Sequence, residues 1–207
     1  MENTAILNNV SRETIEKLKT FQNMVLEWNK KINLISKASE QNIWERHIID
    51  SLQLYPLIEE KDKVLYDFGS GAGFPAIVLA ILSEQFYPNL NITLIESIGK
   101  KVLFLENVKK SLNLNITILK DRIENLNLSK PDIITSRALA SLDKLLEYSI
   151  PFIDKKTKMI FPKGEKWLEE VNKAKIKWLF EYTNIKSITE EKGCILLIKN
   201  VRRKKNG

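Results

Sequence analysis

The sequence has little cysteine and no long apolar run. Its one cysteine, Cys194, excludes an intramolecular disulfide and fits a reducing compartment. A membrane-spanning helix needs roughly 18 consecutive apolar residues, and no such stretch is present. The first residues, MENTAILNNVSRE, lack the basic and apolar regions of a signal peptide. We therefore expect a cytoplasmic protein that does not enter a membrane.

Acidic residues are outnumbered by basic ones. The chain has 33 lysine and arginine residues against 26 aspartate and glutamate residues, which gives a formal net charge of +7. This excess favours an anionic partner, with nucleic acid first and a membrane surface second. A compositional origin is the alternative, because lysine, asparagine and isoleucine are abundant throughout. With 207 residues, of which 43% are hydrophobic, the chain suits one compact α/β domain.

The segment 64–76 combines a short apolar strand, a glycine-rich turn and the start of a helix. Val64–Tyr66 suits a buried parallel strand, Asp67 ends it, and Pro75 stands where a helix would begin. Glycines allow positive φ and close approach of a ligand, and a helix N-terminus offers free N–H groups. The three glycines of the turn are Gly69, Gly71 and Gly73. Their D-x-G-x-G-x-G spacing resembles the first motif of S-adenosylmethionine (SAM) methyltransferases rather than the dinucleotide spacing G-x-G-x-x-G.

Charged side chains follow the later strands of the pattern. Glu96 ends an expected strand over 91–96, about 20 residues past the glycines. A carboxylate at that position can accept hydrogen bonds from both ribose hydroxyls of a nucleoside. A solvated strand end is the alternative for Glu96. Arg137 follows an expected strand over 131–136, and Lys163 follows another over 157–161. Ligands bind beyond the carboxyl ends of such strands, so both cations are candidates for binding.

The N-terminal part is predicted to be helical. Residues 11–29 show apolar spacings of three and four, with Ser11 as N-cap, and a second helix is expected from about Ser39 to Leu57. On that second helix His47 and Asp50 would share a face, and Arg46 would neighbour Asp50. One interpretation is a solvated ion pair beside a packed histidine. The other is a functional role for His47, the only histidine of the chain.

The remaining elements complete an alternating pattern of strands and helices. We expect residues 1–60 to form an N-terminal helical extension, 61–201 the main domain and 202–207 a mobile basic tail, all within one compact unit. The other expected elements are helices over 76–82, 99–113, 142–150 and 165–180, and strands over 115–119, 186–189 and 194–201.

Several segments of the chain carry motifs that occur together, in this order: Trp28–Lys30 with Asn33–Leu34, Arg46–Ser51, Asp67–Pro75, Ser97–Lys101, Ser136–Leu142 and Lys163–Gly164. Together they resemble one family, the bacterial small-subunit ribosomal RNA guanine-N7 methyltransferase G, also called glucose-inhibited division protein B. Departures are Ala76 and Lys101, where the family usually has glycine and arginine, and the resemblance fades beyond Gly164.

The resemblance implies a fold, a donor and an acceptor. The fold would be a Rossmann-like, seven-stranded, mostly parallel sheet with helices on both faces and an N-terminal helical extension. SAM would be the cofactor, and N7 of a guanine in 16S ribosomal RNA of the small subunit would be the acceptor. Apart from the resemblance, we expect a monomer that needs no metal. The expected SAM-binding residues are Asp67, Gly69, Gly71, Gly73, Phe74, Glu96, Ile123, Glu124 and Arg137, and those expected at the RNA are Arg137, Lys163 and His47.

The chemistry of the residues is consistent with that acceptor. Guanine N7 carries a lone pair and no proton, so its methylation needs alignment rather than a general base. Methylation of cytosine C5 needs a cysteine nucleophile, and Cys194 lies in a late strand far from the expected site. The alternatives are a small-molecule methyltransferase, a NAD-binding oxidoreductase, which the glycine spacing disfavours, and a non-catalytic RNA-binding module.

Overall fold

The apolar runs of the sequence form a seven-stranded sheet in the order β3-β2-β1-β4-β5-β7-β6. The computed structural model describes residues 7–204. The first five strands are mutually parallel, whereas β7 runs antiparallel to both of its neighbours, β5 and β6. The strands are β1 (Val64–Phe68), β2 (Asn91–Ile95), β3 (Ile116–Leu119), β4 (Ile133–Thr135), β5 (Lys158–Lys163), β6 (Trp178–Lys186) and β7 (Cys194–Arg203). The predicted seven-stranded, mostly parallel sheet is confirmed.

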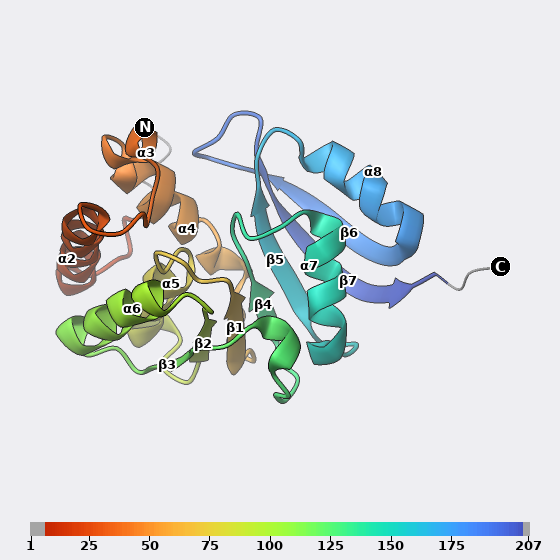
Figure 1. Ribbon diagram of the computed structural model, residues 1–207, viewed down its shortest axis with the longest axis horizontal. Helices are drawn as coiled ribbons and strands as arrows, with labels where there is room; N and C mark the ends of the chain where they lie inside the picture. Colours follow the sequence, from red (N-terminus) through yellow and green to blue (C-terminus); the bar gives the residue numbers. More distant parts are fainter. Residues whose placement is uncertain (1–6, 205–207) are drawn as a thin grey trace.

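Helices cover both faces of this sheet (Figure 1). Alternate residues of a strand point to opposite faces, so Leu65 packs into one apolar cluster while Tyr66 and Phe68 pack into the other. The first cluster contains residues of α2 (Arg12–Asn29), α5 (Ala76–Phe86) and α6 (Gly99–Leu112). The second contains residues of α7 (Leu142–Ser149) and α8 (Trp167–Lys177). The molecule therefore has three layers, with the sheet in the middle.

The first helix forms as its sequence predicts. The Ser11 hydroxyl accepts a hydrogen bond from the Thr14 backbone N–H at 3.1 Å, which caps α2. Leu18, Phe21 and Val25 recur at helical spacing and are fully buried. The Phe21 ring lies 5.0 Å from the ring of Phe74 in the glycine turn. This helix therefore supports the turn directly.

The expected helix over residues 39–57 is wrong as a single element. The segment is divided into α3 (Lys37–Glu40), a π-helical turn at Trp44–Ile49, α4 (Asp50–Leu52) and a 3₁₀ turn at Tyr55–Leu57. A tertiary bond explains part of the irregularity, because the Arg46 carbonyl accepts from the distant Arg137 guanidinium at 3.2 Å. Long-range partners of this kind leave no periodic signal in the sequence.

The C-terminal elements also differ from expectation. Helix α8 ends at Lys177 rather than at residue 180, and Trp178 begins β6, where its indole N–H donates to Asp143 at 2.8 Å. Of the strand expected over 186–189, only Lys186 lies in a strand, as the last residue of β6, and residues 187–189 belong to the loop between β6 and β7. Arg202 and Arg203, expected in a mobile tail, are the last residues of β7, and residues 205–207 lie outside the described part. The other elements agree within a few residues, and two 3₁₀ turns are added, Ile123–Asn125 and Ile150–Phe152.

The topology of the sheet indicates the edge at which a ligand would bind. The strand β1 pairs with β2 on one side and with β4 on the other, so the chain order reverses at β1. Open α/β sheets bind ligands at such a reversal, beyond the carboxyl ends of the strands. Within residues 7–204, no helix has the length and apolar character needed to cross a membrane.

Gly73 gives a direct test of how the turn packs. Its φ is +89°, and an added Cβ would lie 2.5 Å from Cγ1 of Ile77. We expect Gly73→Ala to lower the free energy of unfolding by about 1–3 kcal/mol, from backbone strain and overpacking. Denaturant unfolding measures this loss. Gly164→Ala is the matched control, because nothing lies within 4 Å of its added Cβ. Equal stability of the two variants would contradict the packing role.

Candidate active site

Two adjoining cavities open at the carboxyl end of the sheet, with volumes of about 490 Å³ and 610 Å³. The first lies over the glycine turn and the residues that follow β2 and β3. The second lies between the Arg46–Gln53 segment, the end of β5, α8 and the β6–β7 loop. Four residues line both cavities and form the wall between them, namely His47, Arg137, Ala138 and Leu139. We call these four residues the shared wall.

The glycine turn forms the floor of the first cavity. Gly69 and Gly71 have φ of +67° and +55°. The positive φ of Gly69 favours glycine, and a Cβ there would lie 2.6 Å from the end of the Leu139 side chain, which would have to move. The backbone N–H of Gly69 donates to the Ile95 carbonyl at 2.9 Å, which fixes the turn against β2. Gly73, the last glycine of the turn, lines neither cavity, and an added Cβ there would meet Ile77 and Leu105, so its role in this structure is packing.

Glu96 is held by backbone groups rather than by solvent. It is 5% exposed, and its two carboxylate oxygens accept from Gly71 N–H at 2.9 Å and from Ile98 N–H at 2.8 Å. The solvated strand-end interpretation is therefore wrong. Each carboxylate oxygen can accept a second hydrogen bond, so Glu96 can still meet ribose hydroxyls in the cavity that it lines.

Asp67 lies inside β1, and its side chain is fully buried. Its Oδ1 accepts from the Thr135 hydroxyl at 2.7 Å, whereas its Oδ2 has no hydrogen-bond partner among the described residues. Burial raises the pKa of Asp67 to about 7, against hydrogen bonds that favour the ionised form. Asp67 does not line either cavity, so any contact with a cationic ligand would need a bridging water or a small rearrangement.

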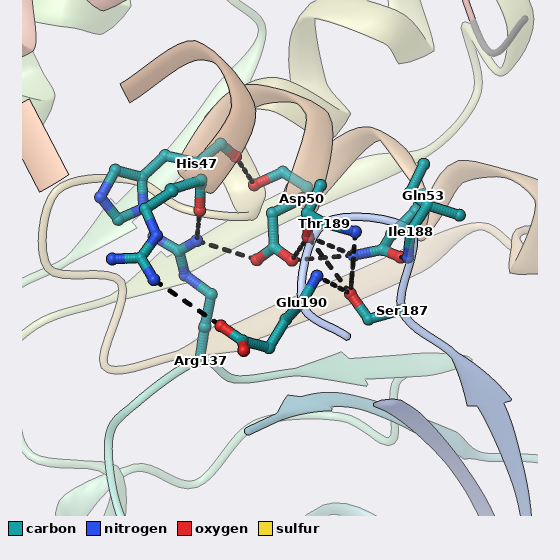
Figure 2. Close-up of polar contacts among 10 residues, drawn as sticks. His47, Asp50, Gln53, Arg137, Ser187, Ile188, Thr189 and Glu190 are labelled. Carbon is teal, nitrogen blue, oxygen red and sulfur yellow. Dashed lines mark hydrogen bonds and ion pairs between the residues drawn. The ribbon is translucent and has the colours of Figure 1, made fainter. Parts of the chain in front are cut away.

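Arg137, which lines both cavities, bonds to residues of the Arg46–Gln53 segment (Figure 2). Its Nη1 donates to Asp50 Oδ2 at 3.0 Å, and its Nη2 lies 2.5 Å from His47 Nδ1. The guanidinium carbon lies 5.0 Å from the centre of the Phe74 ring. Burial lowers the pKa of Arg137, and the Asp50 carboxylate opposes that shift. The side chain is therefore fixed in one position between the cavities.

His47 is held in one protonation state by Arg137. A guanidinium has only donors, so Nδ1 must accept and the ring proton is assigned to Nε2, which is buried and unpartnered in the described structure. The ring stacks on Phe74 with centroids 4.9 Å apart. Burial, together with the charges of Arg137 and Arg46, lowers the pKa of His47 to about 3. His47 is therefore neutral at physiological pH.

Asp50 is a site residue that the sequence analysis missed. Its Oδ2 pairs with Arg137, 87 positions away, and its Oδ1 accepts from Thr189 at 2.7 Å and from Gln53 at 2.8 Å. The expected Arg46–Asp50 pair is wrong, because Arg46 instead lies 3.8 Å from Glu190. The sequence signals that include Asp50 are its helical spacing from His47 and Arg46 and the family motif around Arg46–Ser51, and neither indicates Arg137 as its partner.

Lys163 reaches the second cavity but is not a free cation. Its Nζ lies 2.8 Å from Glu170 Oε2 and donates to the Ala140 carbonyl at 3.1 Å, and its side chain is 8% exposed. This arrangement disagrees with its expected role as a phosphate ligand. Lys166, the N-cap of α8, and Lys173, within that helix, line the same cavity, are exposed, and have no ion pair within residues 7–204.

The other expected SAM-binding residues gather in the first cavity. Phe74, Ile123, Glu124 and Arg137 line it together with Gly69, Gly71 and Glu96. Lining residues that were not expected include Leu34, Ile35, Ser97, Ile98, Lys101 and Tyr148. In the part of the chain that the structure describes, no group of three or more His, Cys, Asp or Glu side chains could hold a metal ion.

The fold is that of SAM-dependent methyltransferases. It is similar to a ribosomal protein L11 methylase from Lactobacillus delbrueckii, with a TM-score of 0.57 and 17% identity, covering 77% of this chain and 79% of that chain. It is also similar to an O-methyltransferase from Bacillus cereus solved with SAH, with a TM-score of 0.59 and 12% identity, covering 95% and 94%. Likenesses at this identity establish the fold alone.

The sequence comparisons identify the family. The model of the family described as rRNA small subunit methyltransferase G matches residues 14–198. A relative with that name from Ruegeria sp. is 41% identical over 94% of both chains. Another from Bartonella bacilliformis is 43% identical over 95% of this chain and 92% of its own. The chain therefore belongs to the rRNA small subunit methyltransferase G family, and the match continues beyond Gly164, where the motif resemblance faded.

The buried carboxyl of Asp67 predicts a pH dependence of stability. Its folded pKa of about 7 lies above the ordinary value of 3.8, so the folded state binds the proton more tightly. Its stabilising contribution is present below about pH 4 and is lost as pH rises through 7. An asparagine at this position would not titrate and would keep an acceptor for Thr135. We expect the melting temperature of Asp67→Asn, minus that of the ligand-free wild type, to increase as the pH rises from 5 to 8. A constant difference over that range would contradict the raised pKa.

Proposed function

We propose that this protein transfers a methyl group from SAM to N7 of a guanine in 16S ribosomal RNA. The observation that carries the proposal is the pair of cavities separated by only the shared wall. A donor in one cavity and a nucleobase in the other would meet at that wall, as a direct transfer between two substrates requires. Family membership supports small-subunit ribosomal RNA as the substrate.

The first cavity fits a nucleoside donor. Glu96 presents fixed carboxylate oxygens to a ribose, and Ile123 and Glu124 lie where an adenine would be flanked. The glycine turn lets SAM contact the backbone. Nearby, Oδ2 of Asp67 is a hydrogen-bond acceptor without a partner among the described residues. SAM supplies a methyl group on a sulfonium, which needs no further activation.

The second cavity fits an acceptor that needs no deprotonation. Its only histidine, His47, is neutral and bonded to Arg137, so it is not available as a general base at Nδ1. Guanine N7 has a free lone pair, and its methylation leaves a cationic base. The carboxylates Glu169 and Glu190 line this cavity and favour such a product electrostatically.

The same cavity offers cations for the RNA backbone. Lys166 and Lys173 are exposed at the start and in the middle of α8, so they are the candidates for phosphate binding, whereas Lys163 is paired with Glu170. Phosphate contacts give affinity without sequence readout and make it salt-dependent. We also propose that the protein acts as a monomer in the cytoplasm.

Methyl transfer to isolated small ribosomal subunits tests the reaction. With methyl-labelled SAM we expect label in 16S ribosomal RNA that, after nuclease digestion, co-migrates with 7-methylguanosine. The subunits come from a strain lacking the enzyme, because their acceptor site is unmethylated, and naked 16S RNA and subunits from the parent strain form the comparison arms. Label at another base, or labelling of small molecules alone, would contradict the proposed acceptor.

Lys173 is expected to contact a phosphate. Lys173→Ala should weaken RNA binding severalfold and reduce the slope of log affinity against log salt by about 0.7–0.9, the value for one lost contact. SAM affinity should stay unchanged. Lys175→Ala is the matched control, because Lys175 is an exposed lysine of the same helix whose Nζ lies 4.9 Å from the centre of the Tyr182 ring. Equal salt slopes for the two variants would place the RNA elsewhere.

A further inference from the structure

The reaction proposed above creates an electrostatic conflict at the shared wall. The SAM sulfonium is a cation, and so is the N7-methylated base that results. The methyl group must pass from the first cavity to the second, so the sulfonium has to lie at the residues that line both. Arg137 is one of these residues, and its guanidinium is always charged. Without a neighbouring negative charge, the Arg137 guanidinium would repel both the sulfonium of the methyl donor and the methylated base.

Asp50 lies where it can cancel this charge. Its Oδ2 bonds to Arg137 Nη1 at 3.0 Å, and the two side chains are only 15% and 17% exposed. A pair that is largely shielded from water interacts more strongly than an exposed one. Asp50 lines the second cavity but not the first, so it stands behind Arg137 as seen from the donor side.

Other residues hold the Asp50 carboxylate in this position. Figure 2 shows Thr189 and Gln53 converging on Asp50 from the β6–β7 loop and from the N-terminal segment. The Gln53 amide is itself fixed, because its oxygen accepts from Ile188 N–H at 3.1 Å and its nitrogen lies 3.3 Å from the Ser187 hydroxyl. These neutral donors orient the carboxylate without altering the net charge of the Asp50–Arg137 pair.

We propose that Asp50 is a positioning residue that neutralises Arg137, so that a sulfonium donor can occupy the shared wall. This inference rests on the proposed function and gives a role to a residue that does not line the donor cavity. A purely structural role for Asp50 is the competing explanation. The two explanations differ in one respect: only charge compensation depends on whether the ligand carries a positive sulfur.

Comparison of SAM with S-adenosylhomocysteine isolates that charge. The two ligands share every group except the methyl, and the second has a neutral thioether. We expect Asp50→Asn to raise the ratio of Kd for SAM to Kd for S-adenosylhomocysteine by roughly fivefold to tenfold, since an unpaired cation then faces the sulfonium in a poorly screened site. Isothermal titration at fixed pH and salt measures both constants.

Two further variants complete the test. Thr189→Val removes a hydrogen bond to the same carboxylate without changing charge, so the ratio should stay at the wild-type value even if both affinities fall. Arg137→Gln leaves the Asp50 carboxylate unpaired beside the donor, so the ratio should fall below the wild-type value. This second direction remains measurable if Asp50→Asn folds poorly.

The outcomes separate this inference from the proposed function. An unchanged ratio in folded Asp50→Asn, or an equal shift in Thr189→Val, would overturn charge compensation while leaving methyl transfer intact. Failure of the wild type to bind SAM, or to methylate small subunits, would instead overturn the proposed function. A rise in Asp50→Asn, a fall in Arg137→Gln and no change in Thr189→Val together would support the role of Asp50.

Discussion

The fixed Arg137 guanidinium is the interaction on which the site depends. A buried cation is costly unless its donors are satisfied. Arg137 meets this requirement with the Arg46 carbonyl, His47 Nδ1 and the Asp50 carboxylate, and it also lies over the Phe74 ring. These partners join the end of β4 to the π-helical turn and to the glycine turn, and Asp50 extends the connection to the β6–β7 loop. The division into two cavities follows from these contacts.

The two acids beneath the first cavity are in different states. Glu96 is satisfied by two backbone N–H groups, so it stabilises the turn that it supports. Asp67 retains an unpartnered oxygen and a raised pKa, so it is a local source of instability in the ligand-free protein. Functional sites often carry such a cost because the unpaired group is reserved for a ligand. Replacing Glu96 by Gln would therefore disturb the turn itself, since an amide NH₂ would face a backbone N–H.

The sequence allowed the sheet and the first cavity to be predicted because both depend on local patterns. Apolar strands, the glycine turn and an acid or a cation at each strand end are readable without knowledge of tertiary contacts, and Glu96 and Arg137 lie at the cavity as expected. Asp50 and Lys163 could not be read correctly in this way. Their partners, Arg137 and Glu170, are chosen by packing between separate elements. The break in the expected helix over 39–57 has the same origin.

The shared wall carries no uncompensated charge, and this is consistent with the chemistry of a sulfonium donor. In the proposed transfer to guanine N7, the methyl group leaves a cation and arrives at an atom without a proton, so no group would need to gain or lose a proton. The only histidine is held neutral, with its Nδ1 occupied, and the nearest cation is bonded to a carboxylate. An acid–base pair would add charge where the reaction already moves a positive charge across the shared wall. What the site supplies instead is alignment of two ligands and a compensated electrostatic field, and both follow from the contacts of Arg137.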